Sequence, residues 1–422
     1  MMDNILKKWQ DYIKMGIRCF GISNIDESEK HFISSYIEAE KLGYPVVIAF
    51  SLRLLAMAQL KKNKFDKAEA GFKKALNICT ELQNNKGISE AKAGLGSVCF
   101  LKGNFEKAEK YYMEAITIYP SDASALRLSM LYTDIGQVYK RLNNWKKAEQ
   151  AVNSALQICR KYCYIPGEGE ITILLGEIVY SQGNIKSAKR NFCEACRLFA
   201  KIGDENSLAN ATQYLAFVLF EDKKYNDALL YIHRSIVLFI KNNKPKELSE
   251  SYYILSNILQ HTRFLDEAQS SIELSMNYFS GSEFGYAVRY QLLAVIAIMK
   301  KEYQYAKYYY LRALKFFEYF GDSPKIGEIC EELTFLIRYE KIYLEDNAYN
   351  WLILRDNCLN KYRLEIIIGL SNKLKEKGKD IMALKCAWKA LEYAQKLNYK
   401  TEETENLIQI MSERIRKKPD KN

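Results

Sequence analysis

The residue types that could do chemistry are few and scattered in this sequence. The three histidines, His31, His233 and His261, lie far apart along the chain, and no motif places one of them beside a nucleophile. The Gly-x-x-x-x-Gly-Lys-Ser/Thr pattern of a phosphate-binding loop does not occur. We therefore predict no catalytic residue, no bound cofactor and no enzymatic activity.

One cysteine pair has the spacing of a redox or zinc site. Cys193 and Cys196 form a Cys-x-x-Cys. Neither a second cysteine pair nor a histidine cluster lies nearby to complete a tetrahedral metal site. In comparable segments of the chain the position of Cys196 holds leucine, isoleucine or methionine, so we interpret it as a small core hydrophobe and expect no metal.

Composition and charge describe a folded chain without a membrane segment. Of the 422 residues 48% are hydrophobic and 27% charged, and no apolar run is long enough to span a bilayer. The start of the chain lacks the apolar core of a secretory signal, so we expect a cytoplasmic protein. The net charge of +11 is spread widely and concentrates only in the tail from Arg414 to Lys421. That tail is either a solvated terminus or a contact for an acidic partner.

An internal repeat must position whatever site the chain has. A bulky aliphatic residue followed by a small one recurs about every forty residues. The small residue is called here the first small position, and it falls at Gly16, Ala56, Gly96, Gly136, Gly176, Ala216, Ser256, Ala294, Thr334 and Ser371. Twelve residues later comes a second small position, at Ser28, Ala68, Ala108, Ala148, Ala188, Ala228, Ala268, Ala306 and Ala383, with Asp346 as the exception. Such a period is typical of stacked structural repeats that form one body.

Each unit has the signals of a helical hairpin. Over residues 90–119 the apolar residues recur at spacings of three and four, interrupted by the turn Lys102-Gly103-Asn104. Glycine or asparagine in such turns can take a left-handed backbone, and Pro120 ends the second helix. Segments such as 83–88, 203–208 and 243–248 suggest long helices joined by slightly longer connections. Close crossing of the two helices explains the small residues.

The pattern resembles the tetratricopeptide repeat. That family's W-x2-L-G-x2-Y, A-x3-F and P pattern is matched in one unit by Tyr132, Ile135, Gly136, Tyr139, Ala148 and Val152. The period exceeds the usual 34 residues or so, as in the long-helix arrays of bacterial quorum-sensing peptide receptors and motor-protein cargo-binding light chains. The resemblance implies an all-α fold, a right-handed α-solenoid of about ten helix-turn-helix repeats with a C-terminal capping helix.

The regularity of the pattern divides the chain. Residues 1–320 hold eight regular repeats, and residues 321–365 a degenerate ninth repeat or joint, in which Asp346, Asn350 and Ile353 replace small or apolar residues. Residues 366–400 form the tenth repeat. Residues 401–422 form a capping helix and basic tail, with Leu407, Ile408 and Met411 on one side of the helix.

The resemblance also implies a binding groove. In this family the first helix of each hairpin lines the concave face, so the residue after the first small position and its neighbours should be exposed there. The candidate groove residues are Thr133, Gln137, Glu177, Tyr180, Gln213, Phe217, Phe220, Tyr253, Asn257, Gln260 and Gln291. Amides can bond a peptide backbone and aromatics can form apolar pockets. The alternative is a solvated face with incidental aromatics.

A glutamate recurs six residues before the first small position. It is present at Glu90, Glu170, Glu250, Glu328 and Glu365. If these side chains face the groove, they form an acidic edge that favours basic ligands and disfavours nucleic acid, whose phosphates require lysine and arginine. The alternative is a solvated row.

These observations favour a non-enzymatic scaffold or adaptor that holds a protein or peptide partner in the concave groove. The alternative is an intracellular peptide-sensing regulator that resembles the quorum-sensing receptors but lacks their N-terminal output domain, because the first repeat begins near Asn4. Partner identity and oligomeric state are left open.

Overall fold

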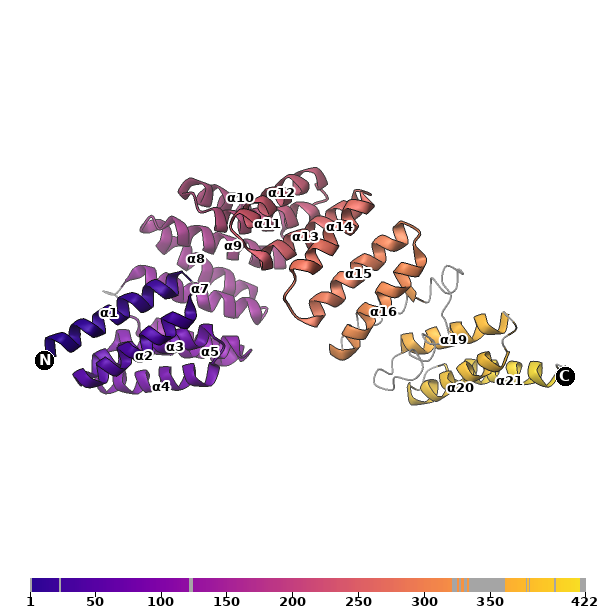
Figure 1. The fold of residues 1–422 in the computed structure, drawn as a ribbon, viewed down its shortest axis with the longest axis horizontal. Helices are drawn as coiled ribbons and strands as arrows, with labels where there is room; N and C mark the ends of the chain where they lie inside the picture. The colour runs from indigo at the N-terminus through magenta and orange to yellow at the C-terminus, as the bar shows by residue number, and fades with distance from the viewer. Residues whose placement is uncertain are drawn as a thin grey trace. The chain divides into compact units, whose positions relative to one another are not determined.

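The computed structural model describes residues 2–22, 24–120, 124–320, 325, 328–329, 332–333, 361–376, 378, 380–397 and 400–417. The chain divides into two compact units, Met1–Lys223 and Lys224–Asn422. Each unit is a run of helices, and each described helix lies beside the next one within residues 2–221, 225–320 and 361–417 (Figure 1).

The first unit contains eleven helices among its described residues. They are α1 (Met2–Gly21), α2 (Ile25–Leu42), α3 (Pro45–Lys61), α4 (Phe65–Glu81), α5 (Asn85–Leu101), α6 (Phe105–Ile118), α7 (Ala125–Arg141), α8 (Trp145–Lys161), α9 (Ile165–Ser181), α10 (Ile185–Ile202) and α11 (Glu205–Glu221). Alternate helices α3, α5, α7 and α9 also contact one another, so the hairpins stack.

The second unit continues the pattern. Its described helices are α12 (Tyr225–Lys241), α13 (Pro245–His261), α14 (Leu265–Tyr278), α15 (Glu283–Met299), α16 (Tyr303–Phe320), α19 (Lys361–Glu376), α20 (Asp380–Leu397) and α21 (Thr401–Lys417). The expected all-α solenoid of helical hairpins is confirmed. None of the described helices is long and apolar enough to cross a bilayer.

The forty-residue period comes from helix length. α3 and α4 have 17 residues each and are joined by three residues. The prediction of longer helices is thus confirmed. The prediction of longer connections is wrong, because most of 83–88, 203–208 and 243–248 belongs to α5, α11 and α13. Their Asn, Asp and Pro are helix-start residues: Asn84 and Asp204 accept hydrogen bonds from the amides of Gly87 and Ser207, and α13 begins with a proline.

The turns within the hairpins use a left-handed residue, as predicted. The middle residue has a φ of 56° at Asn63, 78° at Gly103, 55° at Asn143 and 81° at Gly183. Lys223 takes the same conformation at 59°, so the turn imposes it even where neither glycine nor asparagine is present.

The two small positions of a hairpin touch each other. Where the sequence has serine at one of them, its Oγ donates a hydrogen bond to the backbone carbonyl of the other, twelve residues away. These bonds run from Ser28 to Gly16 at 2.9 Å, from Ser256 to Ala268 at 2.8 Å and from Ser371 to Ala383 at 2.7 Å. The predicted close helix crossing is confirmed.

The first small position also makes room for a bulky side chain of the second helix. A Cβ placed on Gly16 would lie 2.5 Å from the Phe32 ring, and one on Gly176 would lie 2.6 Å from the Phe192 ring. Both phenylalanines lie four residues after the second small position and are fully buried. The aromatic of the family pattern therefore packs directly on the opposite backbone.

Lysines at the hairpin turns connect consecutive hairpins. Lys62 pairs with Glu29 at 2.7 Å, and Lys102 with Asp66 at 2.9 Å and Glu69 at 2.8 Å. Lys102 and Lys73 lower the pKa of Glu69 to about 2. This link between neighbouring hairpins was not predicted.

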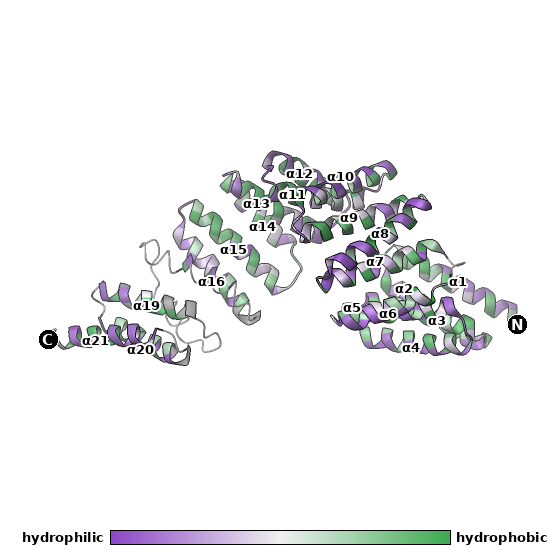
Figure 2. Ribbon diagram, turned by 180° about the vertical axis from the view of Figure 1, so that it is seen from behind, coloured by the Kyte–Doolittle hydropathy of each residue, from purple (hydrophilic) through white to green (hydrophobic). Residues whose placement is uncertain are grey.

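The terminal helix is present as expected. α21 spans Thr401–Lys417 and buries Leu407, Ile408 and Met411 in a core shared with α20. Asp346, Asn350 and Ile353, which define the predicted degenerate repeat, lie outside the described residues. Hydrophobic and hydrophilic residues alternate along most helices, as expected when one face packs and the other meets water (Figure 2).

Candidate functional site: a cavity in the first unit

A cavity of about 510 Å³ opens in the first unit. Its walls come mainly from α3, α5 and α7, the first helices of three consecutive hairpins, with Phe20 of α1 and single residues of α4 and α6. This volume falls in the range of about 300–1,000 Å³ of small-ligand pockets.

Most of the cavity wall is apolar. It is formed by Phe20, Phe50, Leu54, Met57, Leu60, Phe72, Ala93, Phe100, Leu101 and Tyr112. Gly94 lets the Phe72 ring reach the cavity, because a Cβ there would lie 2.3 Å from the ring. Aromatic and aliphatic walls of this kind suit the side chains of a peptide.

An ion pair joins two of the walls. Arg53 on α3 pairs with Glu90 on α5, and their side chains are 13% and 17% exposed. The Arg53 guanidinium also lies 5.5 Å from the centre of the Phe50 ring. The two charges neutralise each other, so they contribute shape and hydrogen bonding more than net charge.

Asp134 on α7 is the unusual residue of the cavity. Its carboxylate forms no hydrogen bond or ion pair with any residue that the structure describes. Burial raises the pKa of Asp134 to about 6, and the Arg127 charge opposes that rise. A carboxyl group left without a protein partner in an apolar wall is available to bind a donor from outside.

Arg127 lies seven residues before Asp134 and faces the same cavity. Its one polar side-chain contact among the described residues is a long one, 3.7 Å from Nη1 to the Met130 sulfur. The cavity therefore offers a cation and an anion, and neither forms an ion pair within the described part of the chain. Seven residues of helix separate their backbones by about 10 Å, which is the length of about three residues of extended peptide.

The position after the first small position lines this cavity in three consecutive hairpins. Met57, Ser97 and Gln137 occupy it. Ser97 Oγ lies 2.8 Å from the hydroxyl of Tyr112, whose ring packs over Gly96. Of the candidate groove residues Gln137 lines the cavity, as does Glu90 of the candidate acidic edge; that they bind a partner stays a prediction.

The other candidates of the first unit lie elsewhere on its helices. Thr133 donates a hydrogen bond to the Ser129 carbonyl at 2.9 Å, and Glu177 pairs with Lys140 at 2.8 Å. The rings of Tyr180 and Phe217 meet edge to face, with centres 5.4 Å apart. Gln213 and Phe220 are half-buried. None of these six residues lines the cavity.

The amide candidates of the second unit form hydrogen bonds within the protein. Asn257 donates to the Tyr253 carbonyl at 2.9 Å, and Gln291 donates to Glu328 at 2.8 Å. Gln260 lies 3.2 Å from the Met299 sulfur. These amide donors already have partners within the protein, so a ligand would have to displace them.

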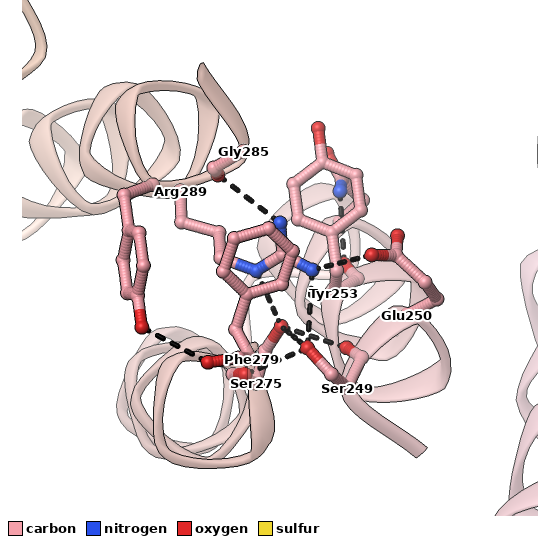
Figure 3. A network of polar contacts seen from close by, with 9 residues as sticks. Ser249, Glu250, Tyr253, Ser275, Phe279, Gly285 and Arg289 are labelled. Carbon is pink, nitrogen blue, oxygen red and sulfur yellow. Dashed lines mark hydrogen bonds and ion pairs between the residues drawn. The ribbon is translucent and has the colours of Figure 1, made fainter. Parts of the chain in front are cut away.

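Tyr253 belongs to a buried network around Arg289 (Figure 3). The Arg289 guanidinium donates to Ser275 at 2.9 Å, to the Gly285 carbonyl at 3.1 Å, to Ser249 at 3.1 Å and to Glu250 at 2.8 Å. The guanidinium carbon Cζ lies 3.9 Å from the centre of the Phe279 ring and 5.3 Å from the centre of the Tyr253 ring. The network ties α13, α14 and α15 together.

The candidate acidic edge is largely paired. Glu90 pairs with Arg53, Glu250 with Arg289, and Glu328 with Lys325 at 2.8 Å. Glu170 has no ion pair among the described residues, and burial together with the Asp204 charge raises its pKa. The side chain of Glu365 lies outside the described residues. A continuous acidic edge stays a prediction.

Sequence reasoning missed Arg53, Arg127 and Asp134. The signal for Asp134 was present, because it stands two residues before the first small position, where the neighbouring hairpins have Leu54, Gly94 and Leu174. Cys193 is exposed and Cys196 half-buried on α10. Among the described residues, no three His, Cys, Asp or Glu side chains gather as metal ligands.

Comparison with known proteins identifies the repeat. The tetratricopeptide repeat family model matches residues 47–121 and 126–201, a stretch that covers nearly all of α3 to α10. No curated protein sequence matches the chain. The solved structures that it resembles share little sequence identity and show the fold alone.

Three of these structures illustrate the likeness. The apo form of the quorum sensor NprR from B. thuringiensis is 16% identical, with a TM-score of 0.57 over 83% of this chain and 97% of that one. A Rap protein complexed with competence and sporulation factor is 16% identical, with a TM-score of 0.51 over 78% and 100%. A putative kinesin light chain from Podosopora anserina with nearly identical TPR-like repeats is 12% identical, with a TM-score of 0.42 over 47% and 98%.

Proposed function

We propose that this chain, built on tetratricopeptide repeats, is a non-enzymatic scaffold or adaptor that binds an extended peptide segment of a protein partner in the cavity of its first unit. The observation that carries the proposal is the pair of side chains Asp134 and Arg127, which face an apolar cavity and have no ion pair with any residue that the structure describes. The apolar wall, the Asp134 carboxylate as acceptor and the Arg127 guanidinium as donor match a peptide that presents both apolar and charged side chains.

The walls favour a bound backbone in extended form. Met57, Ser97 and Gln137 follow one another along three stacked hairpins. The Gln137 amide carries both a donor and an acceptor. The Ser97 hydroxyl already bonds the Ala93 carbonyl at 3.1 Å and the Tyr112 hydroxyl at 2.8 Å, so it contributes a polar surface between the other two positions. A strand that runs across the three hairpins would pass each of these positions in turn.

Selection of random peptides on the full chain tests the proposal. Peptides that bind should lose at least tenfold in affinity with Asp134→Asn and with Met57→Lys, measured by titration calorimetry. Glu106→Gln is the matched control, because Glu106 is an exposed carboxylate on α6 outside the cavity. Selected peptides that bind both cavity variants as tightly as the unmodified chain would contradict the proposal.

A second function is favoured by the likeness to the quorum sensor NprR and to the Rap protein bound to competence and sporulation factor. In that case the chain is a peptide-sensing regulator, and a free peptide of a few residues is its ligand. Small-angle scattering separates the two functions: a sensor compacts when the selected peptide is added, because it passes the signal through the spacing of its hairpins. An adaptor keeps its radius of gyration and holds a whole protein instead.

A further inference from the structure

The outer face of α12 carries three exposed apolar side chains. Leu230 is 67% exposed, Val237 64% and Ile240 56%. The opposite side of the helix is occupied as in other hairpins, with Ile232, Ser235, Ile236 and Phe239 buried. The helix is therefore packed on one face and apolar on the other.

The repeat provides a direct comparison for this face. Leu230, Val237 and Ile240 lie two, nine and twelve residues after the second small position. In the neighbouring second helices of the hairpins these positions hold Ala70, Asn77 and Thr80 of α4, Lys110 and Thr117 of α6, Gln150, Gln157 and Arg160 of α8, Arg190, Arg197 and Ala200 of α10, and Ser270 and Asn277 of α14. α2 and α16 each have one large exposed residue at these positions, Ile37 and Tyr308. The other helices fold with polar or small residues there, so the fold does not require the three apolar residues of α12.

The spacing forms a stripe that another helix could cover. Leu230 and Val237 are seven residues apart and lie nearly in line, and Ile240 extends the stripe on one side. The stripe is about 15 Å long, from the rise of 1.5 Å per residue. Arg234 stands on the other side of the line near the middle of the stripe, exposed and without an ion pair among the described residues. Asp227, also exposed, lies on the same flank at the start of the helix.

We propose that the outer face of α12 docks an amphipathic helix of another protein, with an apolar stripe and carboxylates along one flank. The stripe would bury Leu230, Val237 and Ile240, and the carboxylates would pair with Arg234. A second copy of this chain fits less well, because a two-fold pairing of α12 with itself would bring two Arg234 side chains together near the centre. The site is independent of the cavity in the first unit.

Two synthetic helical peptides of about five turns test the proposal. Both carry a leucine stripe; one has glutamates along one flank, and its twin has lysines at the same places. Fluorescence anisotropy with the full chain should show that the glutamate peptide binds at least tenfold more tightly than the lysine peptide. Leu230→Gln with Val237→Gln, the residues that α8 has at these positions, should weaken the glutamate peptide at least tenfold.

Charge reversal and a matched control complete the test. Arg234→Glu should invert the preference, so that the lysine peptide binds more tightly. Gln150→Ala with Gln157→Ala on α8 should change nothing, and melting curves should show that all variants stay folded. Equal affinity for both peptides, or an affinity unchanged by the α12 double substitution, would overturn the proposal. So would a dimer of the chain in sedimentation that this substitution converts to monomer, because the occupant would then be a second copy.

Discussion

The cavity of the first unit and the Arg289 network of the second use charge in opposite ways. Arg289 is 3% exposed, and its guanidinium has four hydrogen-bonded partners and two aromatic rings around it. Asp134 lies in an apolar wall with no such partner in the ranges that the structure describes, and its pKa is raised to about 6. Both residues lie on the first helices of their hairpins, α15 and α7.

The difference separates structure from binding within one repeat design. A buried charge with all its partners inside the protein holds helices together, and its removal leaves the partners unsatisfied. A buried charge without partners costs stability until something binds it. The repeat supplies the same backbone in both places, so the local side chains decide which role the charge has.

The largest expected effect is the loss of the Arg289 network. Arg289→Met removes the guanidinium that donates to Ser249, Ser275 and the Gly285 carbonyl and leaves the Glu250 carboxylate unpaired, and we expect it to destabilise α13 to α15 by about 3 kcal/mol. Hydrogen exchange of the amides in these helices measures the change. Arg312→Met is the control, because Arg312 is exposed and lies over the Tyr308 ring. Equal protection in the two variants would mean that the network does not hold the helices.

Overpacking of α7 comes next. A Cβ on Gly136 would lie 2.6 Å from Val152 Cγ2, so Gly136→Leu should separate α7 from α8 at a cost of about 1–3 kcal/mol. It should also displace Asp134 and Gln137 and weaken any cavity ligand. Thermal unfolding checks the cost. Gly21→Leu provides the comparison, since a Cβ there meets nothing within 4 Å, and a normal melting profile for Gly136→Leu would contradict the close crossing.

Substitution of Asp134 should have a smaller effect on the free energy of unfolding, and it should stabilise the chain where the two substitutions above destabilise it. Because its folded pKa of about 6 lies above the ordinary value, the native state binds this proton more tightly than the unfolded state. The free energy of unfolding should therefore fall as the pH rises from about 4 to about 6, and stay level above that. Asp134→Asn should remove this fall and stabilise the chain at pH 7 by about 1–2 kcal/mol. Urea unfolding at several pH values measures the free energy of unfolding. If its pH dependence is the same in Asp134→Asn, then another group than Asp134 takes up the proton.

The smallest effect concerns the links between hairpins. Lys102 and Lys73 depress the pKa of Glu69 to about 2, so its contribution to stability is present above about pH 4.5 and is lost as the pH falls toward 2. Glu69→Gln should lower the melting temperature slightly at pH 7 and not at pH 2. In 1 M salt the difference at pH 7 should shrink, because charges are screened within about 3 Å. A difference that persists in salt would point to packing instead.

Much of the fold could be predicted from the sequence because close contact between two helix backbones requires small side chains. Only a small residue fits where two helices cross, so the positions of Gly16, Gly136 and Ser256 revealed the hairpins directly. The left-handed turns could also be predicted, since glycine at positions such as 103 and 183 adopts a positive φ without steric strain. The connections were misread because Asn84 and Asp204 serve both in turns and as helix caps, and the sequence alone does not distinguish the two uses.

The site was less accessible for a different reason. The position after the first small position pointed to Met57, Ser97 and Gln137, which line the cavity, but a fixed position cannot show which charges find partners. The pairing of Arg53 with Glu90 joins residues 37 apart in sequence, and the isolation of Asp134 is a property of what surrounds it. Both are settled by packing between hairpins, which no single unit of the sequence encodes.

The short second helices α6 and α14 indicate where this chain can change its length. Both stop after 14 residues instead of 17. After α6 the connection makes up the difference, and Gly96 and Gly136 remain forty residues apart; after α14 it does not, and Ser256 and Ala294 are separated by thirty-eight. An extra residue inside α13 would turn everything beyond it by about 100°, Tyr253 and its ring contacts included. Insertions and deletions are therefore tolerated between hairpins, and an engineer who wishes to lengthen, tag or graft onto this protein should cut there.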